Sequence, residues 1–231
     1  MSYIKDNIMN LRKQVADTCN KIGRNTEDIQ IIGVTKTIDS DRMSEAIQCG
    51  MTDVGENKVQ EIINKYDIVS PVHWHMIGHL QTNKVKYIID KVKLIHSLDR
   101  ITLAKEINKR AKQHNLIIET LVQVNVAQED TKFGLNCNEV NDFIDQVQEM
   151  ENIKISGFMT IAPYVENPED VRQYFKRLKS MFEEVKSKKM RGVEMKYLSM
   201  GMTNDFQIAI EEGSNMIRVG TGIFGKRNYS K

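Results

Sequence analysis

The stretch "IQIIGVTKTIDSDRMSEAIQCG", residues 29–50, contains a β-rich run followed by a helical pattern. Its first part, "IQIIGVTK" (29–36), is short, apolar and rich in β-branched residues, as a buried strand usually is. Its second part, "DSDRMSEAIQCG" (39–50), spaces its apolar residues as a helix does. A strand that passes directly into a helix is the repeating unit of an α/β fold.

The same alternation continues along the chain. Seven further β-rich runs occupy residues 53–56, 73–78, 94–98, 117–125, 153–160, 195–200 and 216–220. Helical patterns lie between them, for example at 101–115 and at 168–189, where Pro168 and two acidic residues form the first turn. Strands that alternate with helices are normally parallel. Eight such units predict a single-domain (β/α)8 TIM barrel over residues 1–231, compact beside the usual length of about 250 residues.

Two features outside these units complete the expected architecture. Residues 1–21 are charged every few positions, and we expect an additional N-terminal helix there rather than a signal peptide. An open doubly wound sheet is the alternative fold, but the first strand lacks the GxGxxG turn of a dinucleotide site. No linker rich in proline or glycine divides the chain into domains.

The composition argues against two classes of partner. The chain has 33 basic and 31 acidic residues, too even a balance for the one-signed field that nucleic-acid binding uses. The basic run 83–93 is interpreted as a solvated helix face. No run approaches the ~18 apolar residues of a membrane span. The three cysteines form no CxxC pair, which favours reduced thiols and a cytoplasmic location.

Polar residues gather where the predicted strands end. In (β/α)8 barrels the reactive groups lie at the C-terminal ends of the strands, which meet at one mouth. The polar strand-end residues are Lys36, Asn57, His79, Asn125, Thr160, Ser199, Arg218 and Thr221. Lys36 is the most reactive type among them, because apolar walls disfavour its ammonium form and a neutral amine can attack a carbonyl to form a Schiff base. The alternative is an ordinary solvated lysine.

The last two strands end in glycine-rich turns. "NMIRVGTGIFG" (215–225) carries three glycines and Thr221, and "YLSMGMTNDF" (197–206) adds Ser199, Gly201 and Thr203. Taken alone, each glycine-rich stretch is most simply interpreted as an ordinary turn. However, phosphate sites after strands seven and eight recur in (β/α)8 barrels. A phosphate cradle and a Schiff-base lysine together fit pyridoxal phosphate, with Arg218 placed to face the pyridine nitrogen. A sugar-phosphate aldolase would use similar parts, so both ligands stay open.

Three of the five histidines lie in "VHWHMIGHLQTNK" (72–84), a possible metal site. His73 and His75 share one face of a strand, but no acidic residue or cysteine nearby in sequence completes a ligand set. We expect the two histidines to form hydrogen bonds or packing contacts, with Trp74 and Met76 on the other face, and assign no metal ligand. Residues 79–84 are expected to cap the next helix.

The same motifs carry a family resemblance. "GVTKT" (33–37), "GEN" (55–57), "WHMIGHLQTNK" (74–84), "SMGMTNDF" (199–206) and "IRVGTGIFG" (217–225) closely resemble, in order, the YggS/PROSC family of pyridoxal phosphate homeostasis proteins. The resemblance implies a barrel like the N-terminal domain of alanine racemase, which holds pyridoxal 5'-phosphate as a lysine aldimine. The implied cofactor-binding residues are Lys36, Asn57, Ser199, Gly201, Arg218, Gly220 and Thr221. Ile38 stands where many members have a second lysine.

The resemblance further implies a carrier or buffer of the cofactor with no firmly assigned reaction, and we assign no catalytic residue. An arginine at the pyridine nitrogen disfavours its protonation, which makes the ring a weaker electron sink. Because the sequence runs only ten residues past Thr221, we expect no second domain that would supply another base. A racemase-like enzyme is the alternative. The expected partners are pyridoxal phosphate and the apo-enzymes that receive it, and we expect a monomer.

Overall fold

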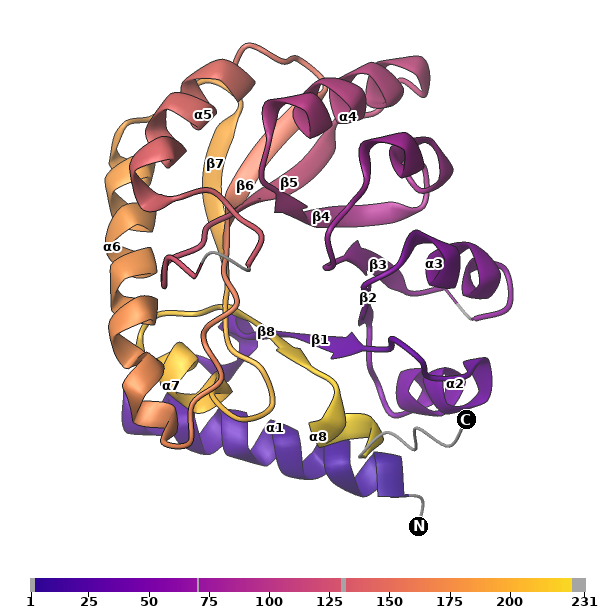
Figure 1. Cartoon of the computed structure of the whole chain (residues 1–231). Coiled ribbons are helices and arrows are strands. Elements are labelled where there is room, and N and C mark those ends of the chain that lie inside the picture. Colours follow the sequence, from indigo (N-terminus) through magenta and orange to yellow (C-terminus); the bar gives the residue numbers. More distant parts are fainter. Residues whose placement is uncertain (1–2, 70, 130–131, 226–231) are drawn as a thin grey trace.

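The computed structural model describes residues 3–69, 71–129 and 132–225. Eight parallel strands form a closed barrel in chain order, and the last strand pairs with the first (Figure 1). The strands are β1 (Gln30–Val34), β2 (Asp53–Glu56), β3 (His73–Met76), β4 (Val92–Leu98), β5 (Ile118–Gln123), β6 (Ile153–Met159), β7 (Val193–Ser199) and β8 (Met216–Val219). The predicted TIM barrel is confirmed, and the doubly wound sheet is excluded.

Helices follow most strands on the outside of the barrel. The α-helices are α1 (Tyr3–Lys21), α2 (Ser40–Gln48), α3 (Val59–Tyr66), α4 (Ile101–Gln113), α5 (Val140–Val147), α6 (Arg172–Ser187), α7 (Phe206–Glu211) and α8 (Thr221–Phe224). Short 3-10 helices are η1 (Thr26–Asp28), η2 (Thr82–Tyr87), η3 (Cys137–Glu139) and η4 (Pro168–Val171).

Two sequence expectations need correction here. Residues 79–84 do not cap an α-helix, because the connection after β3 is the 3-10 helix η2, whose first turn receives no side-chain cap from Gln81. The helix expected at 168–189 is divided, since Pro168 opens η4 before α6 begins at Arg172. Proline fixes its own backbone at a helix start and cannot donate a backbone hydrogen bond, which suits such a separate first turn.

The N-terminal helix α1 lies outside the barrel. Ile4, Ile8, Leu11 and Val15 recur at helical spacing and are buried, so they form one apolar stripe. The stripe packs the helix against α2, α7 and α8, and Figure 1 shows α1 running beneath α7 and α8. This helix therefore braces the part of the barrel where the first and last strands meet. Among the described residues, each helix is too short or too polar to cross a lipid bilayer.

The apolar core has two parts. The larger lies between the strands and the surrounding helices and includes Trp74 and Met76 of β3. The smaller joins residues of five strands, namely Ile32, Leu94, Leu121, Met159 and Met216. Because these strands are not all neighbours, their side chains meet inside the barrel, where layers of side chains fill such folds.

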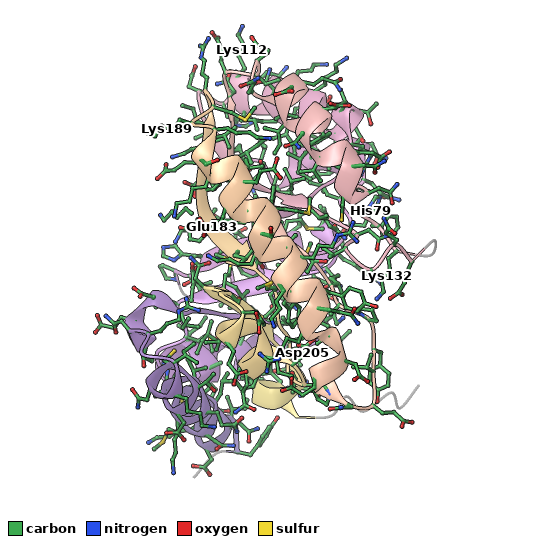
Figure 2. The ribbon with its side chains drawn as sticks, turned by 90° about the vertical axis from the view of Figure 1, so that its left-hand side faces the viewer. His79, Lys112, Lys132, Glu183, Lys189 and Asp205 are labelled. Atoms are coloured by element: carbon green, nitrogen blue, oxygen red, sulfur yellow. The ribbon has the colours of Figure 1, made fainter. Side chains whose placement is uncertain are left out.

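The barrel has a mouth at the C-terminal ends of its strands and a base at the opposite ends. Helices run back from mouth to base, so Lys189, just after α6, marks the base. Figure 2 shows Lys189 on one side of the molecule and His79 and Lys132, which follow β3 and β5, on the other.

Candidate functional site

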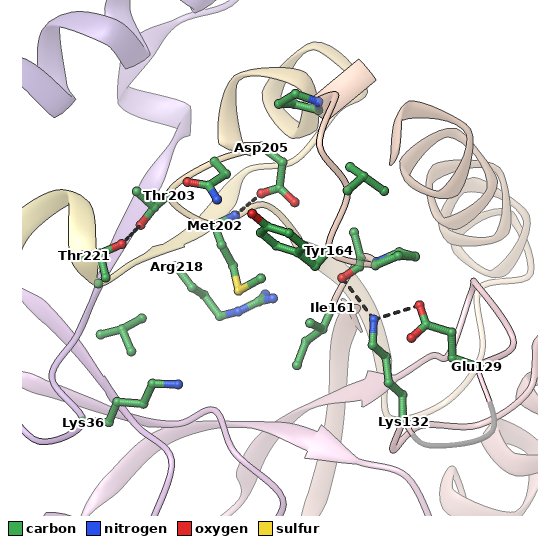
Figure 3. A pocket seen from close by; sticks show the side chains of 17 residues that line it. Lys36, Glu129, Lys132, Ile161, Tyr164, Met202, Thr203, Asp205, Arg218 and Thr221 are labelled. Atoms are coloured by element: carbon green, nitrogen blue, oxygen red, sulfur yellow. Dashed lines mark hydrogen bonds and ion pairs between the residues drawn. The ribbon is translucent and has the colours of Figure 1, made fainter. Parts of the chain in front are cut away.

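A cavity of about 630 Å³ opens at the mouth of the barrel. This volume falls in the range of about 300–1,000 Å³ that is usual for small-molecule sites. Its lining brings together Lys36 after β1, Arg218 on β8, Gly220 and Thr221 after β8, and Thr203 after β7. Figure 3 shows Lys36 and Arg218 pointing into this pocket, with Thr203 and Thr221 at one end. The sequence prediction that these strand ends converge is confirmed.

The backbone around Lys36 is held in an unusual conformation. Thr37, the next residue, has φ 65°, which β-branched residues adopt only under constraint. Its backbone N–H donates to the Glu61 carboxylate at 3.1 Å. On the other side of Lys36, the carbonyl of Thr35 accepts from Lys65 Nζ at 3.1 Å. Both peptide neighbours of Lys36 are thus fixed by side chains of helix α3.

Lys65 is the centre of that arrangement. Its ammonium donates to Glu56 at 2.8 Å and to Glu61 at 2.6 Å. The carboxylate of Glu56 is fully buried and also accepts the hydroxyl hydrogen of Thr35 at 2.7 Å. Burial raises the pKa of Glu56, and the ammonium of Lys65 opposes that shift. A buried ion pair on the outer face of β1 and β2 therefore supports the segment that presents Lys36.

Arg218 is a buried cation at the floor of the pocket. Its side chain donates to Ser199 Oγ at 2.6 Å and to the carbonyl of Thr160 at 2.8 Å. Burial lowers the pKa of Arg218 to about 10, and the negative charge of Asp205 opposes this effect. The guanidinium remains protonated at neutral pH and keeps further N–H groups for a ligand, since a guanidinium has five.

The turn after β8 supplies small residues and hydroxyls beside Arg218. The hydroxyl of Thr221 donates to that of Thr203 at 3.1 Å, and the backbone N–H of Gly222 points at the same oxygen at 3.3 Å. A side chain at Gly222 would come within 2.9 Å of Val219 and 3.2 Å of Thr203. Glycine therefore lets the backbone approach the hydroxyls closely, which suits an oxyanion such as phosphate.

The far end of the pocket contains residues that were not predicted from the sequence as site residues. Lys132 pairs with Glu129 at 2.9 Å and donates to the carbonyl of Ala162 at 3.2 Å (Figure 3). Tyr164 and Asp205 also line the cavity. Lys132 and Tyr164 lie in loops after β5 and β6, where neither periodicity nor a glycine pattern marks a site. Asp205 lies in the motif at 199–206, but no role was predicted for it.

Three residues predicted to bind the cofactor are not among those that line this cavity. Asn57 lines a separate cavity of about 560 Å³ with His79, Lys84 and Tyr87. Ser199 is fully buried beneath the pocket, where its hydroxyl is engaged by Arg218. Gly201 has φ 94°, and a side chain there would come within 2.6 Å of Ala209, so this glycine is needed for packing against α7. Ser199 and Gly201 are not among the residues that line the cavity, and their contact with a phosphate stays a prediction.

The paired histidines form hydrogen bonds, as expected, but their partner was missed. Asp53 on β2 accepts from His75 Nε2 at 2.9 Å and lies 3.2 Å from His73 Nδ1. His79 instead stacks on Phe133, with 3.9 Å between the ring centroids. Asp53 is 20 or more positions away in sequence, and only the pairing of β2 with β3 brings it close.

Comparison with known proteins identifies the family. The family model described as "alanine racemase, N-terminal domain" matches residues 8–228 of the chain. The chain belongs to this family. An Aquifex aeolicus protein named pyridoxal phosphate homeostasis protein is 43% identical over 219 residues, covering 94% of this chain and 95% of that protein. A protein of the same name from Escherichia coli strain K12 is 33% identical over the full length of both. The resemblance seen in the five motifs is confirmed.

Solved structures agree with this family assignment. PipY of Synechococcus elongatus, in a structure with pyridoxal phosphate bound, is 27% identical with a TM-score of 0.83, over 96% of this chain and all of that one. Alanine racemase from Corynebacterium glutamicum is 12% identical with a TM-score of 0.72, and the match covers 99% of this chain and 62% of the racemase. The racemase comparison supports the barrel fold alone.

Proposed function

We propose that this protein binds pyridoxal 5'-phosphate as a Schiff base on Lys36 and acts in the homeostasis of that cofactor, as a carrier or buffer. One observation carries the proposal. Lys36 and Arg218, from the first and last strands of the barrel, line one pocket together with the Thr203 and Thr221 hydroxyls. The names of the relatives and the cofactor-bound PipY structure support the same ligand.

The pocket residues match the chemical groups of the cofactor. The amine of Lys36 would condense with the aldehyde and release one water molecule. The hydroxyls of Thr203 and Thr221 and the backbone around Gly220 and Gly222 would hold the phosphate. Arg218 would donate to the pyridine nitrogen. When bound, pyridoxal phosphate supplies an imine that water or another amine can exchange, which is what a carrier requires.

Arg218 also explains why we favour a carrier over an enzyme. A guanidinium next to the pyridine nitrogen disfavours protonation of that nitrogen, so the ring withdraws electrons less strongly. Removal of a proton from a bound amino acid would therefore be slow.

A transfer assay tests this function. The protein is loaded with pyridoxal phosphate, freed of excess cofactor and mixed with the apo-form of a pyridoxal-dependent enzyme, whose regained activity is followed over time. We expect the loaded protein to reactivate the enzyme while a phosphatase in the mixture destroys free cofactor. Lys36→Ala is the control that should lose this protection. Turnover of an amino acid by the protein itself, at an enzyme-like rate that Lys36→Ala abolishes, would instead establish a racemase-like enzyme.

A further inference from the structure

A continuous chain of hydrogen bonds crosses the inside of the barrel from its base to the pocket. At the base, Asp53 Oδ1 lies 2.9 Å from His75 Nε2. His75 Nδ1 lies 3.0 Å from His96 Nε2, and His96 Nδ1 lies 3.2 Å from Ser199 Oγ. Ser199 Oγ accepts from Arg218 at 2.6 Å. The step from His96 on β4 to Ser199 on β7 joins strands that do not pair, so it spans the barrel interior.

The two ends of the chain fix its direction. Arg218 can only donate hydrogen bonds, and an ionised Asp53 can only accept them. Burial acts to raise the pKa of Asp53, but hydrogen bonds from His75 and Thr52 and the charge of Lys93 outweigh it and hold that pKa below its usual range. With a pure donor at one end and a pure acceptor at the other, every link must point towards Asp53.

That direction dictates the protonation of both histidines. Burial lowers the pKa of His75 against the opposing effect of Asp53. Burial, together with the neighbouring His75 and Arg218, lowers the pKa of His96 well below its usual range. Both rings are therefore neutral, and each carries its single hydrogen on Nε2. His96 Nδ1 is then an acceptor that takes the hydroxyl hydrogen of Ser199.

We propose that Asp53, His75 and His96 are positioning residues for Arg218: they turn the Ser199 hydroxyl so that its oxygen faces the guanidinium. If the hydroxyl hydrogen pointed at Arg218, two donors would face each other and a buried cation would lose a partner. The inference rests on the proposed function where it concerns the cofactor, because Arg218 is the group that would meet the pyridine nitrogen. The proposal gives residues at the base of the barrel a role in positioning Arg218, which the sequence motifs at the mouth do not indicate.

The Arg218 environment shows why this orientation matters. The guanidinium is 4% exposed, and among the described residues it forms no ion pair within contact distance. Its side-chain partners there are Ser199 Oγ and the carbonyl of Thr160. A buried charge is costly unless its donors are matched by acceptors. The hydroxyl orientation therefore determines whether one of two acceptors is present.

Nuclear magnetic resonance of the cofactor-free protein tests the chain directly. Nitrogen-15 spectra of the imidazole rings distinguish neutral from charged histidine and show which nitrogen carries the hydrogen. The signals of His75 and His96 are assigned by substituting each of them with glutamine in turn. We expect both rings to be neutral with the hydrogen on Nε2. A ring with its hydrogen on Nδ1, or a charged ring at neutral pH, would overturn the proposal.

Cofactor release tests the consequence for Arg218. In Ser199→Ala the guanidinium loses one acceptor, and we expect dissociation of pyridoxal phosphate to become roughly 10- to 100-fold faster, the range for one hydrogen bond to a charged group. The matched control is Ser97→Ala, because the Ser97 hydroxyl is equally buried and has no hydrogen-bond partner among the described residues. Equal rates in the two variants would contradict the assignment.

Asp53→Asn tests transmission from the far end. An asparagine can donate to His75, which would let both imidazoles reverse and deprive Ser199 of its acceptor. We expect altered imidazole signals together with faster cofactor release and a shifted absorption maximum of the bound cofactor. Glu119→Gln is the control, because Glu119 is a carboxylate near the base that lies 4.0 Å from Lys154 and outside the chain.

The outcomes separate this inference from the proposed function. A wild-type protein that binds no pyridoxal phosphate refutes the function, while the imidazole spectra still decide whether the chain exists. A protein that binds the cofactor and releases it at the same rate in wild type, Asp53→Asn and Ser199→Ala refutes the positioning role alone. If Asp53→Asn fails to fold, the wild-type spectra and the comparison of the two serine variants remain decisive.

Discussion

The substitution Lys65→Met tests the buried support behind Lys36. Lys65 is 9% exposed and contacts two carboxylates and the Thr35 carbonyl. Among the described residues, its removal leaves the fully buried Glu56 with the hydroxyl of Thr35 as its remaining hydrogen-bond donor. Breaking one side of a buried ion pair costs about 3–5 kcal/mol of unfolding free energy. The exposed pair of Lys188 and Glu184 provides the control, and Lys188→Met should cost less than about 1 kcal/mol.

The stability that Lys65→Met loses should depend on pH in a defined direction. Burial already raises the pKa of Glu56, and without the ammonium of Lys65 that pKa rises further. An acid whose pKa is raised by folding favours the folded state in its protonated form, so the folded state loses stability as the pH increases through that range. Lys65→Met should therefore be most destabilised in alkaline solution and recover towards pH 5.

Urea unfolding, followed by the fluorescence of Trp74, measures these effects, because Trp74 is the single tryptophan and is buried. The double variant Glu56→Gln with Lys65→Met should regain roughly half of the lost stability, because the uncompensated charge is gone. A loss below about 1 kcal/mol for Lys65→Met, or a loss equal at pH 5 and pH 8, would refute the reasoning.

Three further predictions concern single positions. Folding lowers the pKa of Asp53, so the ionised carboxylate stabilises the folded protein at pH values above the usual pKa of an aspartate. The difference in unfolding free energy between wild type and Asp53→Asn, measured by chemical denaturation, should therefore shrink as the pH falls from 6 to 3. Thr37→Gly relieves a positive φ and should raise the urea midpoint by an amount equivalent to about 1 kcal/mol, whereas an unchanged or lower midpoint would show that Thr37 is not strained. Gly157→Ala places a methyl group 1.8 Å from the carbonyl oxygen of Tyr197, so expression of soluble folded protein should fall sharply, and a normal circular dichroism melting curve would contradict the register of β6 and β7.

Much of the mouth of the barrel was predictable from the sequence. Strand and helix patterns alternate clearly, so the closed barrel and the convergence of Lys36, Arg218 and Thr221 follow from rules about parallel strands. The direction of a side chain at a strand end is harder to predict, because one residue of shift changes the face it occupies. Ser199 illustrates this limit: it ends β7 as expected, yet its hydroxyl faces the interior beneath Arg218.

Contacts between distant residues escaped prediction for another reason. Asp53 and His75 are 22 positions apart, and His96 and Ser199 are 103 apart, so no local pattern connects them. Lys132 lies in a loop whose sequence has no periodicity. The buried hydrogen-bond chain and the far end of the pocket became visible only when the register of the strands and the course of the loops were known.

The central claim is that Lys36 carries pyridoxal phosphate, and borohydride reduction followed by peptide mass mapping tests it most directly. The purified protein is mixed with the cofactor, its absorption spectrum is recorded, and the reduced product is digested beside Lys36→Ala. We predict a yellow protein whose pyridoxyl group maps to Lys36 and is lost in the variant. A colourless protein that cannot be loaded with pyridoxal phosphate, or a pyridoxyl group on another lysine with Lys36 unmodified, would contradict the account. Trapping of a sugar phosphate on Lys36 in the cofactor-free protein would favour an aldolase in its place.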